Sequence, residues 1–427
     1  MQIVTPRESD VLMLIRRHGP LSRQELHCRM QMRPNTVGDL AASMLRRGLL
    51  RERESHCIGR GRPQRPLEID PEKCRIVGMA FQPGRVSACT LNLHGCRLGA
   101  IQERSTRSAR AVVASACEVL QAIGTNHTLG IGISTTGFVD PQTRCILTSS
   151  ATQRQSPTSL EPIYAAAGKC PVLVENDMHA QGAYWLLSRD GCGDEDVLLI
   201  ELRDGAIGAA LLVGGRPNRG CIVGGNEIGH TRFPVETEQC YCGRSGCLER
   251  ICSSSFLRRI TGATRGDLYQ HLRTARPEDS AVLQIMRHLA SGIANAVNLI
   301  RPNRVVLTGQ LTECLTFTNR LTQDVRERLL APLIDRVRID TWDRPTVSFA
   351  EAGAWLVLAA IYHGSRNEPG AWAGAPSTGA EQLTAMATSS PTAAGHSHRA
   401  SLGPSHALRR HCRRPSHRPG RSGPRSA

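Results

Sequence analysis

Four potential metal ligands lie within the eighteen residues from 230 to 247. They are His230, Cys240, Cys242 and Cys247, spaced His-x9-Cys-x-Cys-x4-Cys. Imidazole nitrogen and thiolate sulfur form the tetrahedral shell of structural zinc sites, and Gly243 and Gly246 permit the tight loop that such a shell requires. The spacing therefore predicts a structural Zn²⁺ site. Two alternatives stay open from the residues alone. The thiols are ordinary buried cysteines in a chain with 16 Cys, or Cys252 replaces one of the four ligands.

Two further groups of polar residues adjoin apolar stretches of the chain. Asn176 and Asp177 directly follow the apolar run 171–175, and the segment Glu-Ile-Gly-His at 227–230 leads into the cysteine cluster. Open α/β sheets bind ligands at the carboxyl ends of their strands, where such side chains gather. The sequence predicts a polar ligand pocket with the metal loop against one wall.

The elements that must position these residues alternate between strands and helices. Short apolar runs bounded by glycine or polar residues indicate strands, and longer runs with helical periodicity indicate helices. The predicted strands are 76–80, 86–91, 129–134, 171–175, 197–202, 209–213 and 304–308, and the predicted helices are 109–123 and 279–299. The first two strands resemble a hairpin, and the order as a whole is typical of an α/β fold.

The N-terminal region predicts three short helices. An apolar face on residues 8–19 indicates the first helix, and Ser22 with Glu25 forms a capping box at the start of the second. Pro34 suits the first turn of a third helix, which Gly48 ends. Three helices with a tight turn between the last two predict a helix-turn-helix, with the third helix as the recognition helix.

Two strands, 49–54 and 65–69, flank a basic wing with the sequence Gly-Arg-Gly-Arg-Pro at 59–63. A winged helix-turn-helix of this kind predicts contacts with double-stranded DNA. The residues expected to reach bases or phosphates are Arg33, Asn35 and Thr36 in the third helix and Arg60 and Arg62 in the wing. The alternative is a helical protein-interaction module with a solvated basic face; the capping box, the helix order and the wing together favour DNA.

The positive charge is concentrated at the two ends of the chain. Of the formal net charge of +16 over 427 residues, residues 1–65 contribute 13 Arg against 6 acidic residues, and residues 366–427 contribute 9 Arg against 2 Glu. A nearly neutral body with basic ends indicates a polyanionic partner. Residues 366–427 are rich in Ala, Ser, Gly, Pro, His and Arg and predict a disordered basic tail.

The N-terminus carries Arg7, Glu8 and Asp10 rather than the apolar segment of a signal peptide. No run approaches the roughly eighteen apolar residues that span a bilayer. We expect a cytoplasmic protein without membrane attachment. Its thiols are then reduced, which favours metal binding over disulfides.

These motifs resemble those of the ROK family (repressors, open reading frames and kinases), specifically its sugar-responsive repressors of the xylose and N-acetylglucosamine type. The resemblance covers about residues 8–365 and rests on the winged head, the Asn176-Asp177 junction and the run from Glu227 to Glu249. It implies a two-lobed, actin- and hexokinase-like fold behind the head. The implied units are a winged helix-turn-helix at 1–70, a first lobe at 75–190 completed by a terminal helix at 350–363, a second lobe with the zinc loop at 191–345, and the tail at 366–427.

The resemblance also implies roles for individual residues. In kinases of the family, the Asp of the Asn-Asp pair takes a proton from a sugar hydroxyl, and the other motif residues hold further hydroxyls. The implied sugar-binding residues here are Asn176, Asp177, Glu227, His230 and Glu249. The family pattern ends its metal ligands at Cys247, which removes Cys252. His230 then serves both the metal and the sugar.

Departures from the family pattern decide between kinase and sensor. Kinases begin the first lobe with Asp-x-Gly-Gly-Thr, a phosphate-binding turn, whereas this chain has Ala-Phe-Gln-Pro-Gly at 80–84. Proline removes an N–H and fixes φ, so this turn cannot form the same cradle. The second glycine turn is also altered, because Ala206 stands where the family has Gly, although Gly205 lies one position earlier. Asp177 then marks the position of the kinase base without being catalytic.

The sequence therefore predicts a non-enzymatic transcriptional regulator, a repressor of sugar-metabolism genes. We expect a sugar or sugar phosphate as effector, a DNA operator as partner, and a homodimer or homotetramer, because operator half-sites require paired heads. Effector binding would change lobe closure, transmitted through the zinc loop and the linker at 66–75. The alternatives are an ATP-dependent sugar kinase and a regulator controlled by a protein partner.

Overall fold

The computed structural model describes residues 3–54, 65–106, 108–149, 157–188, 195–218, 225–276, 278–342 and 347–363. The predicted wing at 59–63, with Arg60 and Arg62, and the predicted tail at 366–427 lie outside these residues.

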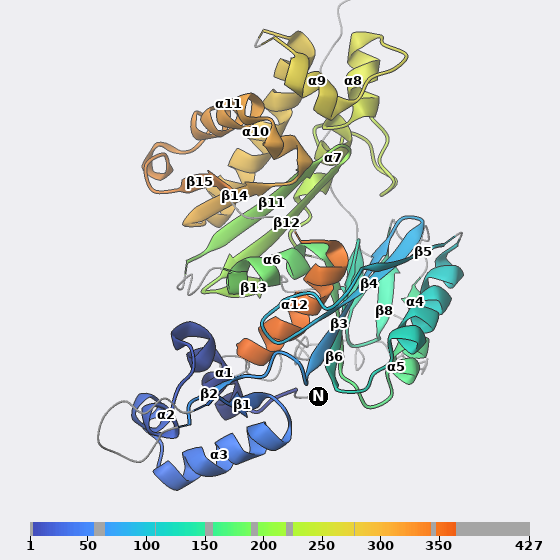
Figure 1. The fold of residues 1–427 in the computed structure, drawn as a ribbon. Helices are drawn as coiled ribbons and strands as arrows, with labels where there is room; N and C mark the ends of the chain where they lie inside the picture. The colour runs from blue at the N-terminus through green and yellow to red at the C-terminus, as the bar shows by residue number, and fades with distance from the viewer. Residues whose placement is uncertain are drawn as a thin grey trace, which may run out of the picture. The chain divides into compact units, whose positions relative to one another are not determined.

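The N-terminal region contains three helices and one antiparallel strand pair (Figure 1). The elements are α1 (Pro6–His18), α2 (Arg23–Met30), α3 (Pro34–Arg46), β1 (Leu50–Glu52) and β2 (Leu67–Ile69). The predicted capping box of Ser22 and Glu25 is present. The first helix begins earlier than predicted, at Pro6, because Thr5 and Glu8 form a second capping box.

One five-stranded sheet follows, with the order β10-β6-β3-β4-β5. Its strands are β3 (Arg75–Gln82), β4 (Arg85–Leu91), β5 (Gln102–Ser105), β6 (Thr128–Thr135) and β10 (Val172–Asn176). β3, β4 and β5 are joined in antiparallel pairs, whereas β6 is parallel to both β3 and β10. The predicted hairpin is thus β3–β4. A small sheet is formed by β7 (Phe138–Asp140), β8 (Cys145–Thr148) and β9 (Thr158–Ser159).

Helices cover both faces of this sheet. Successive side chains of β3 point to opposite faces, and both sets are apolar and buried. Val77 and Met79 pack in the core beneath α4 (Ala109–Ile123) and α5 (Glu161–Ala167), whereas Ile76 and Ala80 belong to the core of α12 (Phe349–Tyr362). On the α12 face the backbones approach closely. A Cβ on Gly132 would overlap the carbonyl oxygen of Gly353. α12 is therefore fitted closely against β3 and β6 of this sheet.

The second five-stranded sheet has the order β13-β12-β11-β14-β15. Its strands are β11 (Val197–Arg203), β12 (Ala206–Val213), β13 (Arg216–Asn218), β14 (Arg304–Thr308) and β15 (Arg338–Thr341). β11, β12 and β13 are antiparallel, and β11, β14 and β15 are parallel.

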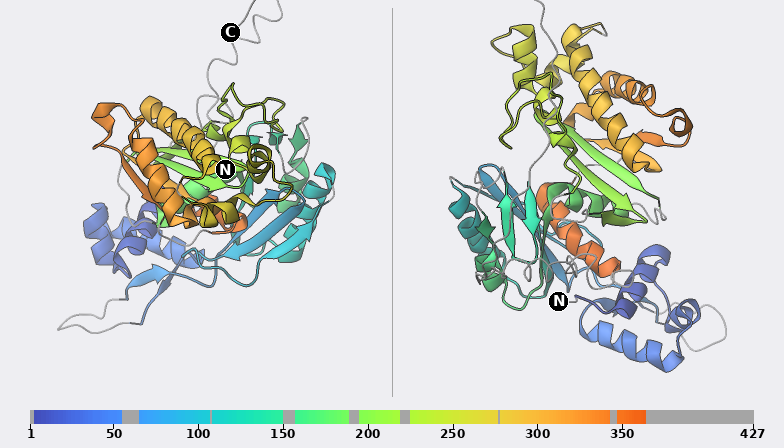
Figure 2. Two further views of the ribbon diagram at one scale, coloured as in Figure 1. Left: turned by 90° about the horizontal axis from the view of Figure 1, so that it is seen from above. Right: turned by 180° about the vertical axis from the view of Figure 1, so that it is seen from behind.

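One face of this sheet packs against a group of helices whose main member is α10 (Ser280–Ile300). The others are α7 (Leu248–Ile251), α8 (Ser254–Thr261), α9 (Leu268–Thr274) and α11 (Leu315–Arg326), with the 3₁₀ turns η1 (Ile228–His230), η2 (Gln310–Glu313) and η3 (Ala331–Leu333). The opposite face packs against α6 (Asp177–Ser188) through Met178, Trp185 and Leu186. α6 also packs against α12, and Figures 1 and 2 show the two helices side by side.

The structure thus confirms a mixed α/β fold, built mainly on two five-stranded sheets. None of the helices in the described part of the chain is long and apolar enough to cross a membrane.

Candidate functional site

The Asn176-Asp177 junction connects the end of β10 to the start of α6. The Asn176 side chain bridges two backbone groups: its Nδ2 donates to the Gly137 carbonyl at 3.1 Å, and its Oδ1 accepts from the Met178 N–H at 2.9 Å. Asp177 Oδ1 accepts from the same N–H at 2.9 Å. Burial raises the pKa of Asp177 above its usual value, and Arg203 opposes this shift. The junction is a rigid turn with a partly buried carboxyl group.

Two short elements bring Glu227, His230 and Glu249 together. Glu227 precedes η1, which contains His230, and Glu249 lies in the single turn of α7. Gly229 fits against the Ile207 carbonyl of β12, where a side chain would clash. His230 Nε2 lies 3.9 Å from Glu227 Oε2, and His230 Nδ1 lies 3.6 Å from Glu249 Oε1.

The carboxyl groups form one electrostatic cluster. Burial raises the pKa of Glu227 to about 7, and the nearby Asp177 and Glu249 contribute to this rise. Burial likewise raises the pKa of Glu249 to about 7, against hydrogen bonds and Arg250, which lower it. Four of the five predicted sugar-site residues therefore lie near one another. Glu227, His230 and Glu249 are linked by the distances above, and Asp177 by its effect on the pKa of Glu227. The Asn176 amide is instead engaged by the turn itself.

Sequence reasoning missed Glu201, which lies near the end of β11. Burial raises its pKa to about 7, Arg203 at 2.8 Å opposes the shift, and Asp177 adds to it. A carboxylate near the carboxyl end of a buried strand is the signal that could have found it.

The predicted metal ligands come together as a compact group. One ligand atom from each of His230, Cys240, Cys242 and Cys247 lies within 4.8 Å of all the others. The Cys240 Sγ is 3.7 Å from His230 Nδ1, and the Cys242 and Cys247 Sγ atoms are 3.6 Å apart. Cys252 is buried but is not part of this group. The four residues form a His/Cys cluster that could hold a metal ion.

Tyr241, which lies between two cysteines of the His/Cys cluster, contacts His230. The Tyr241 hydroxyl is 3.1 Å from His230 Nε2, and the two rings meet edge to face. The two nitrogens of His230 therefore have different neighbours. Nδ1 faces Cys240 and Glu249, whereas Nε2 faces the Tyr241 hydroxyl and, farther away, Glu227.

Residues 104–341, more than half of the chain, match the ROK family. The chain belongs to the ROK family. One relative is a xylose repressor from Caldicellulosiruptor sp. (strain Rt8B.4), which is 25% identical over 70% of this chain and 81% of the relative. The DNA-binding transcriptional dual regulator NagC of Escherichia coli (strain K12) is 23% identical over 71% of this chain and 80% of NagC.

Solved structures share the fold. A ROK family transcriptional regulator, a homologue of the E. coli MLC protein, has a TM-score of 0.70 at 23% identity. The match covers 84% of this chain and 96% of the regulator. The ROK hexokinase from Thermus thermophilus has a TM-score of 0.54 at 23% identity, covering 69% of this chain and all of the hexokinase chain.

Two turns of this ROK chain differ from a phosphate cradle. The β3–β4 turn contains Pro83, which has no N–H, and the Arg85 Nε donates to Gln82 Oε1 at 3.0 Å across the turn. In the β11–β12 turn, Gly205 has φ of 69°, but its N–H donates to the Cys252 carbonyl at 2.9 Å. That amide is not available to a phosphate.

The described DNA-binding candidates lie at the start of α3. Arg33 is the N-cap residue and makes no side-chain capping hydrogen bond. Arg33 and Asn35 are exposed, and Thr36 is partly exposed. These side chains are accessible to a partner.

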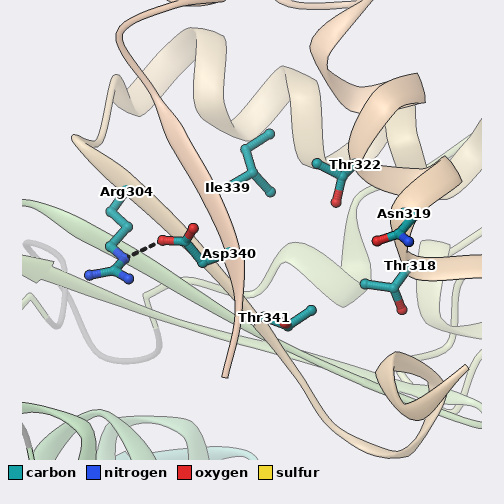
Figure 3. A pocket seen from close by; sticks show the side chains of 7 residues that line it. All are labelled: Arg304, Thr318, Asn319, Thr322, Ile339, Asp340 and Thr341. Atoms are coloured by element: carbon teal, nitrogen blue, oxygen red, sulfur yellow. Dashed lines mark ion pairs between the residues drawn. The ribbon is translucent and has the colours of Figure 1, made fainter. Parts of the chain in front are cut away.

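A separate cavity of about 440 Å³ lies between α11 and the strands β14 and β15 (Figure 3). Its lining residues are Arg304, Thr318, Asn319, Thr322, Ile339, Asp340 and Thr341. Arg304 and Asp340 form an ion pair at 2.6 Å. None of the predicted site residues lines this cavity.

Proposed function

We propose that this ROK protein is a DNA-binding transcriptional repressor of sugar-metabolism genes, controlled by a sugar or sugar phosphate. Asp177, Glu227, His230 and Glu249 would hold the effector, with Asn176 stabilising the turn. Sugars are polyols, and a site of fixed carboxylates and imidazole discriminates against ligands that would leave these groups unpaired. The named relatives are a xylose repressor and NagC, which fits this assignment.

The share of this chain that each solved structure matches favours a regulator over a kinase. The match to the hexokinase covers 69% of this chain and the whole hexokinase chain. The match to the regulator covers 84% of this chain. Residues 75–363 make up only about two thirds of the 427 residues, so a match over 84% of the chain supports a contribution from the N-terminal region. Three helices followed by an antiparallel strand pair have the order of a winged helix-turn-helix, with α3 as the recognition helix.

Zinc fits the His/Cys cluster. In a tetrahedral site with Zn–S of ~2.3 Å and Zn–N of ~2.0 Å, neighbouring ligand atoms lie about 3.5–3.8 Å apart. The distances of 3.7 Å between Cys240 Sγ and His230 Nδ1 and 3.6 Å between the sulfurs of Cys242 and Cys247 match this range. Bound zinc would fix the loop and keep His230 neutral. Its Nε2 would then carry a proton to donate to a ligand hydroxyl.

The DNA-binding part of the proposal is tested by selection from a random duplex library with the purified full chain. A single enriched motif with two half-sites is expected, because paired heads in a homodimer or homotetramer read two half-sites. Failure to enrich any sequence contradicts DNA recognition. An Arg33→Ala variant should weaken binding and reduce its salt dependence.

The effector part is tested by fluorescence anisotropy on the selected duplex. D-xylose, D-glucose, N-acetylglucosamine and N-acetylglucosamine 6-phosphate form the panel. At least one sugar should change the Kd for DNA, and an Asp177→Asn variant should lose this response. If no sugar changes the Kd while DNA binding stands, control by a protein partner is favoured.

The second candidate function is a sugar kinase, favoured by the retained Asp177. A coupled assay for ADP release with ATP and the same sugars distinguishes it. We expect no turnover, since both phosphate-binding turns are altered.

A further inference from the structure

Asn226, immediately before Glu227, has an unusual backbone conformation. Its φ is 72°, in the left-handed region that side chains other than glycine rarely adopt. Asparagine tolerates this region better than most residues, but the conformation persists only where surrounding contacts hold it. The hydrogen bonds of the Asn226 side chain supply such contacts.

The amide group of Asn226 is oriented by its neighbours. Its Nδ2 lies 2.7 Å from the Asn218 carbonyl at the end of β13, which can only accept a hydrogen bond. The same Nδ2 lies 3.1 Å from His179 Nε2. Since Nδ2 must donate to the carbonyl, its second proton points to the imidazole, and His179 Nε2 must accept.

His179 is buried in α6, two residues after Asp177, and is only 5% exposed. With Nε2 accepting, its proton resides on Nδ1, which lies 3.2 Å from the buried Glu175 Oε2. Glu175 thus selects the imidazole tautomer that Asn226 requires. The three side chains form a continuous chain from β10 through α6 to the segment that carries Glu227.

We propose that the hydrogen-bonded chain Glu175–His179–Asn226 positions the carboxylates of the effector site. This inference rests on the proposed function, because that function defines the effector site. It links the element that begins with Asp177 to the residue before Glu227. The two carboxylates come from segments fifty residues apart in sequence, at 177 and 227, and this chain of hydrogen bonds sets their relative position. His179 and Asn226 act through Glu227 and need not contact the effector.

Amide hydrogen exchange in the sugar-free protein tests the chain directly. The readouts are the Ile228 and His230 N–H groups, which donate to the Asn226 and Glu227 carbonyls at 2.8 and 3.1 Å. His179→Phe and Asn226→Gly should each accelerate exchange in peptides covering 225–231 by at least about tenfold. His179→Gln, which keeps one donor and one acceptor, should restore slow exchange to within about threefold of wild type.

The matched control is His127→Gly, which relaxes another positive φ, of 59°, at an exposed position. It should leave exchange at 225–231 unchanged. Unaltered exchange in His179→Phe, or failure of His179→Gln to rescue, overturns the proposal. This readout needs no sugar, so it decides the positioning role even if the proposed function fails.

Calorimetric titration with D-xylose and N-acetylglucosamine then tests the consequence. For whichever sugar binds the wild type, His179→Phe should weaken binding about tenfold at unchanged zinc content, and His179→Gln should recover most of the affinity. Equal affinity in wild type and His179→Phe overturns the link to the effector site. If neither sugar binds the wild type, D-glucose and N-acetylglucosamine 6-phosphate are titrated in the same way. If none of the four sugars binds, the sugar-sensor function falls, and the exchange data alone decide the inference.

Discussion

At the residue scale, His230 belongs to two neighbouring groups. Its Nδ1 faces Cys240, and its Nε2 faces the Tyr241 hydroxyl and Glu227. A metal on one nitrogen fixes the tautomer and the ring orientation on the other. Loss of the proposed zinc should therefore disturb the proposed effector site as well as the loop, and this connection leads to two predictions.

Replacing one thiol should abolish metal binding. Cys242 is exposed, so Cys242→Ser removes a ligand without leaving a void in the core. We expect the zinc content to fall from about one ion per chain to nearly none, with a lower Tm, since metal binding contributes to folding. Inductively coupled plasma mass spectrometry and thermal melts measure both. Cys96→Ser, also exposed but outside the cluster, is the control. Full zinc retention in Cys242→Ser would contradict the assigned ligands.

Removing the Tyr241 hydroxyl should increase sugar affinity. The hydroxyl is 3.1 Å from His230 Nε2, the group expected to donate to the effector, so it competes with a sugar hydroxyl. Tyr241→Phe removes this competitor, and a gain of about 3–10-fold in affinity follows from the net value of one hydrogen bond. Calorimetry measures it. Tyr269→Phe, which loses a hydrogen bond to Glu313 elsewhere, should leave the affinity unchanged. Equal or weaker binding in Tyr241→Phe would show that the hydroxyl does not compete.

At the element scale, apolar runs and end signals allowed the larger elements to be predicted. The helix predicted at 109–123 is α4, and the strand predicted at 304–308 is β14. The short elements could not be predicted in this way. η1 spans three residues and α7 spans four, fewer than periodicity requires, and the site residues on them were found only through their motif. His179 was missed because its partner Asn226, 47 residues away in sequence, is brought to it only by tertiary structure.

The close fit of α12 on the first sheet gives a stability prediction. A Cβ on Gly132 would overlap the Gly353 carbonyl, a backbone atom that cannot move independently of the helix. Gly132→Ala should lower the free energy of unfolding by about 1–3 kcal/mol, the usual cost of overpacking a core. Chemical denaturation followed by circular dichroism measures this. Gly38→Ala in α3, where a Cβ meets no atom within 4 Å, should be neutral or stabilising. Undiminished stability of Gly132→Ala would contradict the close approach.

At the scale of the whole molecule, one apolar core includes residues of the N-terminal helices together with α6 and α12. The Arg16 guanidinium of α1 lies 4.8 Å from the Tyr362 ring centroid and 5.8 Å from that of Trp355. Its Nη2 also donates to the Leu187 carbonyl at 3.5 Å. α6 therefore begins at Asp177 in the proposed effector site and contacts the N-terminal region near its other end. This helix offers a direct physical route between the proposed effector site and the N-terminal region, in addition to the proposed routes through the linker and the His/Cys loop.

Arg16→Ala should uncouple the two functions. It removes the Arg16 contacts with Leu187, Trp355 and Tyr362 and leaves the apolar contacts of α1 and the whole of α3 in place. DNA affinity in the absence of sugar should therefore stay within about threefold of wild type. The sugar-induced change in Kd should shrink, because a ligand shifts an equilibrium only through contacts that differ between the two states. Anisotropy on the selected duplex, with and without sugar, measures both quantities. Arg17→Ala removes the same charge at an exposed neighbouring position and should retain the full response. A normal sugar response in Arg16→Ala would rule out the α6 route, whereas equal loss in both variants would attribute the effect to charge alone.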